Sequence, residues 1–190
     1  MAKKRYTGRS GLRVLAGGQD PTARIGAVSV VVAPEDNPPF AVQARVLEED
    51  TFLVMSAGPT VCEPEEDPIR LMTQLIETRP EVPGSVRICG RGPYRMLAIV
   101  HDVNQEPTWR ESWVVEALEG AICAAEERGI KSLSLEMLGC VHGRLDPMRF
   151  TALLTETIHR TPPERIQRIW LVPPRGVREA DVARRLRATS

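Results

Sequence analysis

Gly139 and Gly143 lie four positions apart in a segment that follows a strand-like apolar run and precedes Pro147. Glycine lets the backbone approach a ligand closely and adopt positive φ angles. A helix starting at Asp146-Pro147 would add free N–H groups and the positive end of its dipole. Such a loop is typical of an anion or pyrophosphate site. An ordinary tight strand-to-helix connection would carry the same residues, and the segment is neither a P-loop nor a GxGxxG motif.

Three other side chains near this loop could take part in chemistry. His142 could contact phosphate or act as a general base, or be a solvated loop histidine. His101 ends a strand-like run beside Asp102, but adjacent strand residues point to opposite faces, which weakens a His101–Asp102 pair. Cys140, near a helix N-terminus, could have a depressed pKa, although the sequence places no partner base.

Strand and helix patterns alternate along most of the chain. Thr108 and Glu111 have capping-box spacing, which predicts a helix over Trp109–Arg128. Further helices are expected from Asp67-Pro68, from Asp146-Pro147 and over Ala180–Ala188. The expected strands are Leu12–Leu15, Ala23–Ala33, Phe40–Val46, Thr51–Ser56, Ser85–Cys89, Tyr94–His101, Ser132–Met137 and Ile166–Val172.

This alternation predicts an α/β fold with a mixed, mostly parallel sheet and helices on both faces. Ala23–Ala33 and Phe40–Val46 are expected to form an antiparallel pair. Ligands of such sheets lie outside the carboxyl ends of the strands, where the 139–146 loop would be. We expect a flexible N-terminal arm over residues 1–22 and a single domain over residues 23–190.

The composition argues against several classes of protein. The chain has 190 residues, with 25 basic and 25 acidic side chains, so no overall field steers it to nucleic acid or to a membrane surface. None of the four cysteines lies in a CxxC pair, and the three histidines are far apart, so we expect no metal site. No secretory signal or membrane-length apolar run is present, which favours a cytoplasmic location. The oligomeric state cannot be read from the sequence.

The run from Met137 to Asp146 resembles the second ligand loop of macrodomains. It is most similar to the branch containing the terminal ADP-ribose protein glycohydrolase, which has a Gly-Cys-x-x-Gly-x-Leu-Asp pattern. Glu106-Pro107-Thr108-Trp109 is similar to the Pro-Thr-aromatic motif upstream in that branch, and Pro83-Gly84 also suits the family. The resemblance covers roughly residues 50–172.

The resemblance implies a three-layer α/β/α fold with a cleft for ADP-ribose or a related nucleotide diphosphate, without a further cofactor. Asp36 and Asp50 are the two candidates for the aspartate that holds adenine in the family. The ligand-binding residues that it implies are Gly139, Cys140, Val141, His142, Gly143 and Arg144 in the loop, with Ser56 and Gly58 after the strand over Thr51–Ser56.

The chain departs from that branch where the branch has its catalytic lysine and aspartate. The corresponding positions are Val100 or His101 and Gly143, and Val141 replaces a glycine. The first hypothesis is therefore a binding module without efficient catalysis. The second is a hydrolase of ADP-ribosyl or O-acyl-ADP-ribose substrates, with His142 or His101 as a substitute base. The third is a structural or interaction protein whose cleft is vestigial.

Overall fold

The computed structural model describes residues 21–55 and 79–189. Seven strands form one mixed sheet in the order β1-β2-β7-β6-β3-β5-β4, with β2, β7, β6, β3 and β5 parallel to their neighbours in that series. The strands are β1 (Thr22–Ile25), β2 (Val28–Val32), β3 (Ala44–Asp50), β4 (Val86–Cys89), β5 (Tyr94–His101), β6 (Ser132–Glu136) and β7 (Arg168–Val172). The predicted mixed, mostly parallel sheet is confirmed.

The antiparallel pairs lie at the two edges of the sheet. β1 and β2 form a hairpin around Gly26, whose φ of +57° suits glycine, so the predicted single strand Ala23–Ala33 is in fact two strands. β4 pairs antiparallel with β5 at the other edge. The expected antiparallel partnership of Ala23–Ala33 with Phe40–Val46 is wrong, because β3 lies between β6 and β5 and is parallel to both.

The third strand lies further along the chain than its hydrophobic pattern indicates. It begins at Ala44 and runs through Glu48, Glu49 and Asp50, all three of which are buried. The predicted strand Thr51–Ser56 is wrong, because residues 51–55 turn away from the sheet and Ser56 lies outside the described residues. Buried carboxylates therefore end this strand, four residues beyond Val46, where the predicted strand Phe40–Val46 ended.

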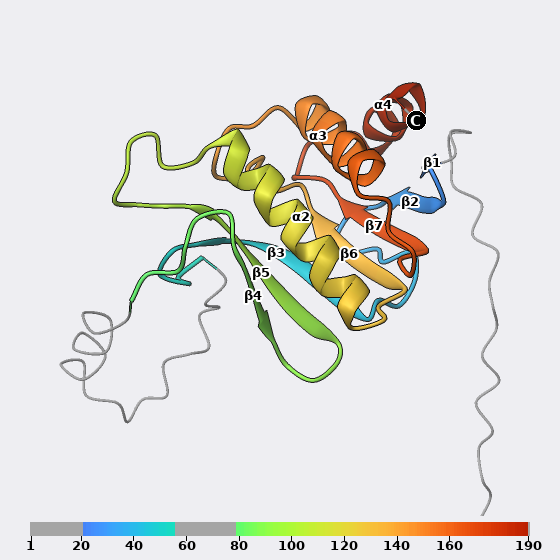
Figure 1. Ribbon diagram of the computed structural model, residues 1–190. Coiled ribbons are helices and arrows are strands. Elements are labelled where there is room, and N and C mark those ends of the chain that lie inside the picture. Colours follow the sequence, from blue (N-terminus) through green and yellow to red (C-terminus); the bar gives the residue numbers. More distant parts are fainter. Residues whose placement is uncertain (1–20, 56–78, 190) are drawn as a thin grey trace, which may run out of the picture.

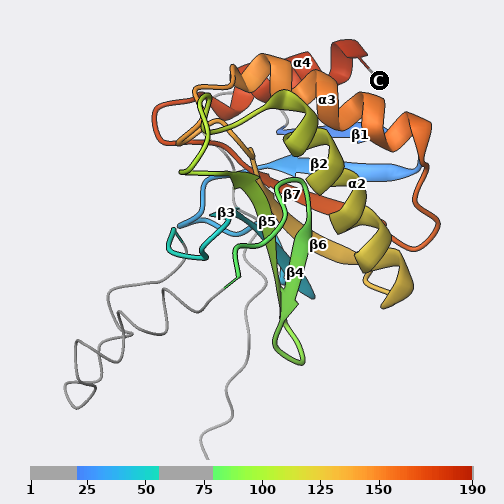
Figure 2. The same cartoon turned by 60° about the vertical axis from the view of Figure 1, so that its left-hand side comes forward.

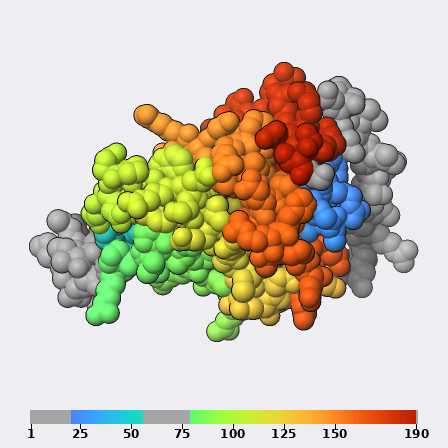
Figure 3. All heavy atoms as spheres, turned by 45° about the horizontal axis from the view of Figure 1, so that its top comes forward, coloured from blue at the N-terminus to red at the C-terminus, as the bar shows by residue number. Residues whose placement is uncertain are grey.

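The three helices within the described ranges lie on one face of the sheet (Figures 1 and 2). Helices on both faces were expected, and because the helix predicted from Asp67-Pro68 falls outside those ranges, a helical layer on the other face stays a prediction. They are α2 (Glu111–Glu127), α3 (Pro147–Arg160) and α4 (Glu179–Thr189). α2 contacts β5 and α4 contacts β1 and β2, while α3 lies between the other two helices. Figure 3 shows the three helices side by side on this face. Among the largest fully buried side chains between helices and sheet are Phe150, Met96, Leu118, Leu154 and Ile169.

The two helices that flank the candidate loop begin differently. α3 starts as predicted, with Pro147 in its first turn and the Asp146 carboxylate accepting the N–H of Met148 at 3.0 Å. The predicted capping box of α2 is wrong. Its N-cap is Arg110, which makes no side-chain capping bond, because Thr108 accepts the Asp102 N–H through its carbonyl and so belongs to the preceding loop.

Several predictions fall on residues outside the described ranges. These are the strand Leu12–Leu15, the helix from Asp67-Pro68, and the candidate ligand residues Ser56 and Gly58. The division into an arm over residues 1–22 and a domain over 23–190 also stays a prediction. Within residues 21–55 and 79–189, no helix combines the length and apolar character that crossing a membrane requires.

The Glu126 side chain of α2 binds the backbone of residues 164–166, which lead into β7. Its carboxylate accepts the backbone N–H groups of Glu164, Arg165 and Ile166 at 2.9–3.2 Å. We expect Glu126→Ala to lower the free energy of unfolding by about 2 kcal/mol, since hydrogen bonds to a charged acceptor are stronger than neutral ones and Ile166 is buried. Urea unfolding followed by circular dichroism measures the change.

The neighbouring Glu127 provides the control. It is exposed, and its carboxylate makes a 3.5 Å ion pair with Arg128 and accepts from the Cys123 thiol at 3.7 Å, so Glu127→Ala should change the stability by less than about 0.5 kcal/mol. Equal losses in the two variants would contradict the role given to Glu126.

Candidate functional site

The loop between β6 and α3 is folded closely on itself. The Leu145 N–H donates to the Gly139 carbonyl at 2.9 Å, and Gly139 and Arg144 have φ angles of +76° and +60°. A Cβ at Gly143 would lie 2.7 Å from the Gly139 carbonyl oxygen and 2.9 Å from the Trp109 ring. Both glycines thus have a packing role that any ligand role would have to accompany.

The backbone N–H groups of this loop divide into two sets. Gly139 donates to the Glu48 carboxylate at 2.8 Å, and Cys140 donates to the Met137 carbonyl at 3.0 Å. Within the described part of the chain, no acceptor is recorded for the N–H groups of residues 141–144. Val141, His142 and Arg144 are exposed and Gly143 is buried, so most of these residues lie where an anion could reach a backbone N–H group.

Two N–H groups at the ends of this loop, those of Gly139 and of Met148 at the start of α3, already have acceptors. The protein's own carboxylates occupy them: Glu48 accepts from Gly139, and Asp146 accepts from Met148. An ionised carboxylate beside these groups already supplies the negative charge that N–H groups and a helix N-terminus favour. The middle of the loop, residues 141–144, therefore has donors that these carboxylates do not occupy.

Glu48 links the loop to β5. Its Oε1 lies 2.5 Å from His101 Nε2 and its Oε2 accepts the Gly139 N–H, and the Glu48 and His101 side chains are 4% and 6% exposed. The Glu48 N–H in turn donates to the Glu136 carboxylate at 2.9 Å. A carboxylate this deeply buried requires hydrogen-bond partners, and β5 and the loop supply them.

The two histidines considered for catalysis occupy different environments. His101 is buried and paired with Glu48, whereas His142 is exposed in the loop. Their rings meet edge to face with centroids 6.1 Å apart. Asp102 does not orient His101, because its carboxylate accepts the Asn104 N–H and the Gln105 side-chain amide. The weakness expected of a His101–Asp102 pair is thus confirmed.

The two acids after Glu48 serve the turn at the end of β3. The Glu49 carboxylate accepts the Met55 N–H at 2.7 Å, and the Asp50 carboxylate accepts those of Phe52, Val54 and Met55 at 2.6–3.2 Å. Among the described residues, no three His, Cys, Asp or Glu side chains form a group that could hold a metal ion.

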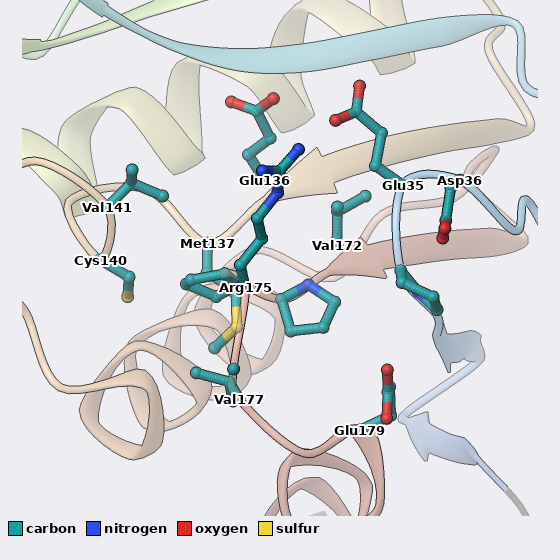
Figure 4. A pocket seen from close by; sticks show the side chains of 14 residues that line it. Glu35, Asp36, Glu136, Met137, Cys140, Val141, Val172, Arg175, Val177 and Glu179 are labelled. Carbon is teal, nitrogen blue, oxygen red and sulfur yellow. The ribbon is translucent and has the colours of Figure 1, made fainter.

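A cavity of about 910 Å³ opens beside the loop, at the carboxyl ends of β2, β6 and β7 (Figure 4). Its lining includes Met137, Val172, Val177, three prolines and the loop residues Cys140 and Val141. Its charged lining residues are Glu35, Asp36, Glu136, Arg175 and Glu179. Of the two aspartates considered for adenine, Asp36 lines this cavity and Asp50 does not.

Some charged side chains around the cavity have ion-pair partners and others do not. Glu35 is paired with Arg45 at 2.9 Å, while burial raises the pKa of Glu136, and the nearby Glu48 and Glu35 carboxylates add to that rise. Arg175 points into the cavity from the segment after β7 (Figure 4). It forms no ion pair with any residue that the structure describes. Its guanidinium is thus a donor available to an anionic ligand.

No family model matches the sequence, and no curated protein matches it at a significant level. Solved structures do match. A variant of the Oceanobacillus iheyensis macrodomain with ADPR aligns with a TM-score of 0.62 and 14% identity, over 87% of this chain and 95% of that chain. The same macrodomain with ADP aligns at 0.61 and 13%, over 87% and 93%. The Thermus aquaticus DarG macrodomain aligns at 0.53 and 19%, over 76% and 98%. The fold is that of a macrodomain.

At these identities the likeness concerns the fold, and the resemblance to the glycohydrolase branch stays a prediction. Within the macrodomain fold, the 139–146 loop and the cavity lie at the carboxyl ends of neighbouring strands, where a ligand of an α/β sheet is expected. The sequence reasoning missed Arg175 and Glu136. Glu136 lies at the end of the predicted strand Ser132–Met137, and Arg175 follows the predicted strand Ile166–Val172. Their positions at the carboxyl ends of strands could have identified them.

Cys140 cannot serve as a nucleophile in this environment. Burial raises the pKa of its thiol to about 12, and the Glu48 and Asp146 carboxylates contribute to the rise. The expectation of a depressed pKa at a helix N-terminus is wrong, because burial disfavours the charged thiolate and the two carboxylates add to that effect.

Thiol reactivity tests this assignment. Since the thiolate is the reactive form, Cys140 in the native protein at pH 8 should react with an aromatic disulfide reagent at least about 100-fold more slowly than the exposed Cys123 of α2. The measurement compares two variants that each keep only one of these cysteines, with serine at the other cysteine positions. Comparable rates would show that Cys140 is an accessible, ordinary thiol.

Proposed function

We propose that this chain binds ADP-ribose or a related nucleotide diphosphate in the cavity beside the 139–146 loop. One observation carries the proposal: through Cys140 and Val141 the loop lines a cavity of about 910 Å³ into which Arg175 points, and the N–H groups of residues 141–144 have no acceptor among the described residues. The two Oceanobacillus iheyensis structures, solved with ADPR and with ADP, support the proposal by their shared fold.

The charged side chains of the cavity favour one orientation of the bound ligand. The phosphates would lie at the loop, where Arg175 and the N–H groups of residues 141–144 supply donors to negative oxygens. The nucleoside would lie toward Asp36 and Glu179, whose carboxylates can accept hydrogen bonds from amino and hydroxyl groups but would repel phosphate. The apolar lining from Met137, Val172 and the prolines suits the face of a base.

The proposed activity is binding without efficient catalysis. The lysine and aspartate of the glycohydrolase branch have no counterparts here, and His101 is buried against Glu48. A hydrolase is the second candidate, favoured by the exposed His142 beside the buried Glu48–His101 pair. An ADP-ribosylated or O-acyl-ADP-ribose substrate decides between them. Turnover that His142→Ala abolishes would establish the hydrolase, and no turnover by the parent protein would end it.

Melting curves with and without millimolar ADP-ribose provide the first test of binding. A ligand that binds only the folded chain raises the melting temperature, and at 100 times its Kd it adds about 2.7 kcal/mol of stability. No shift with ADP-ribose, ADP or adenosine would favour the third hypothesis, a structural or interaction protein with a vestigial cleft.

Titration calorimetry of an arginine variant tests the position of the phosphates. We expect Arg175→Ala to weaken ADP-ribose binding by about tenfold, since a charge-assisted hydrogen bond contributes roughly 1.5–3 kcal/mol, and to leave adenosine binding within about twofold. Arg185→Ala removes an equal charge from α4, outside the cavity lining, and serves as the control. Similar losses for ADP-ribose and adenosine in Arg175→Ala would contradict this placement.

A further inference from the structure

The buried Glu48 carboxylate lies against the start of the 139–146 loop, on the side that faces the sheet. Its carboxylate accepts the Gly139 N–H at 2.8 Å, and Gly139 is only two residues before the first of the N–H groups without an acceptor. The one partner able to carry a compensating positive charge is His101, which does so only when protonated, and Arg and Lys residues in the described ranges make no ion pair with Glu48. The loop therefore already holds one anion of the protein's own.

The charge of Glu48 extends to the wall of the cavity. It contributes to the raised pKa of the Cys140 thiol, and Cys140 lines the cavity beside Val141 (Figure 4). On the same wall, burial is the main cause of the raised pKa of Glu136; the Glu48 backbone N–H opposes that rise and the Glu48 charge adds to it. Since charge–charge interactions are weakly screened in buried surroundings, a phosphate bound at residues 141–144 would experience the same repulsion.

We propose that Glu48 sets the charge selectivity of this site, as an internal anion that disfavours each additional negative charge on a bound ligand. The inference rests on the proposed function and deepens it. It specifies a ligand whose diphosphate is esterified at both ends, as in ADP-ribose, in preference to one with a free terminal phosphate group, as in ADP. Glu48 acts through the loop and its field and is thus a specificity-determining residue without a catalytic role.

Glu48→Gln removes the charge while keeping the shape. The glutamine carbonyl can still accept the Gly139 N–H, and its amide can donate to His101 once the imidazole takes the other neutral tautomer. We expect calorimetry to show about tenfold tighter binding of ADP-ribose, a larger gain for ADP, and a change within about twofold for adenosine. The gain should increase with the negative charge of the ligand.

Glu49→Gln is the matched control. Glu49 is the next residue on β3, equally buried, so its side chain leaves the opposite face of the strand, and its carboxylate binds the turn at Met55. This variant changes the net charge by the same amount, and we expect less than about threefold change for any of the three ligands. The parent protein alone provides a further test, because its Kd for ADP-ribose should be lower than its Kd for ADP.

Each outcome bears on a distinct claim. Equal weakening of all three ligands by Glu48→Gln would show that Glu48 only holds the loop in place, and equal gains in both variants would show that only net charge matters. Either result, or tighter binding of ADP than of ADP-ribose by the parent, overturns the inference and leaves the proposed function intact. If the parent and both variants bind none of the three ligands, the proposed function fails and the inference fails with it.

Discussion

The Glu48 carboxylate is the point on which the geometry of this site depends. It is almost fully buried, and a buried ionised group is tolerable only where hydrogen bonds replace those lost to water. His101 of β5 and the N–H of Gly139 supply those bonds, so one side chain of β3 joins two other segments. The start of the loop is thereby positioned, and the bonds that fold Leu145 back on Gly139 and seat Gly143 against Trp109 complete its shape. The unpaired N–H groups of residues 141–144 follow from that shape.

The same interaction divides the site electrostatically. The Glu48 carboxylate lies against the start of the loop, while Arg175 supplies positive charge from the segment after β7. The proposed preference for a ligand with phosphates in its middle and uncharged, hydroxyl-bearing groups at its ends follows from this arrangement. The macrodomain fold thus carries a polar site whose charge distribution is determined by this chain's own side chains, and fold likeness alone could not have predicted it.

Much of the architecture could be predicted from the sequence where local signals and packing agree. β5 was predicted with its observed bounds, and the Asp146-Pro147 start of α3 was correct because a cap and a first-turn proline act locally. The end of β3 was missed because Glu48, Glu49 and Asp50 are buried acids, which no periodicity of apolar residues identifies. The loop glycines could be identified from their spacing. Their occupied and free N–H groups, and the approach of Arg175, arise from tertiary contacts between distant segments and could not.

Amide proton–nitrogen correlation spectra of the labelled chain, recorded during titration with ADP-ribose, test the central claim most directly. The account predicts that the largest shifts fall on the amides of residues 141–144 and on the cavity lining near Arg175. The Gly139 amide, held by Glu48, should shift much less. Shifts confined to another surface, a Gly139 amide that moves as much as its successors, or no shifts at all would contradict it.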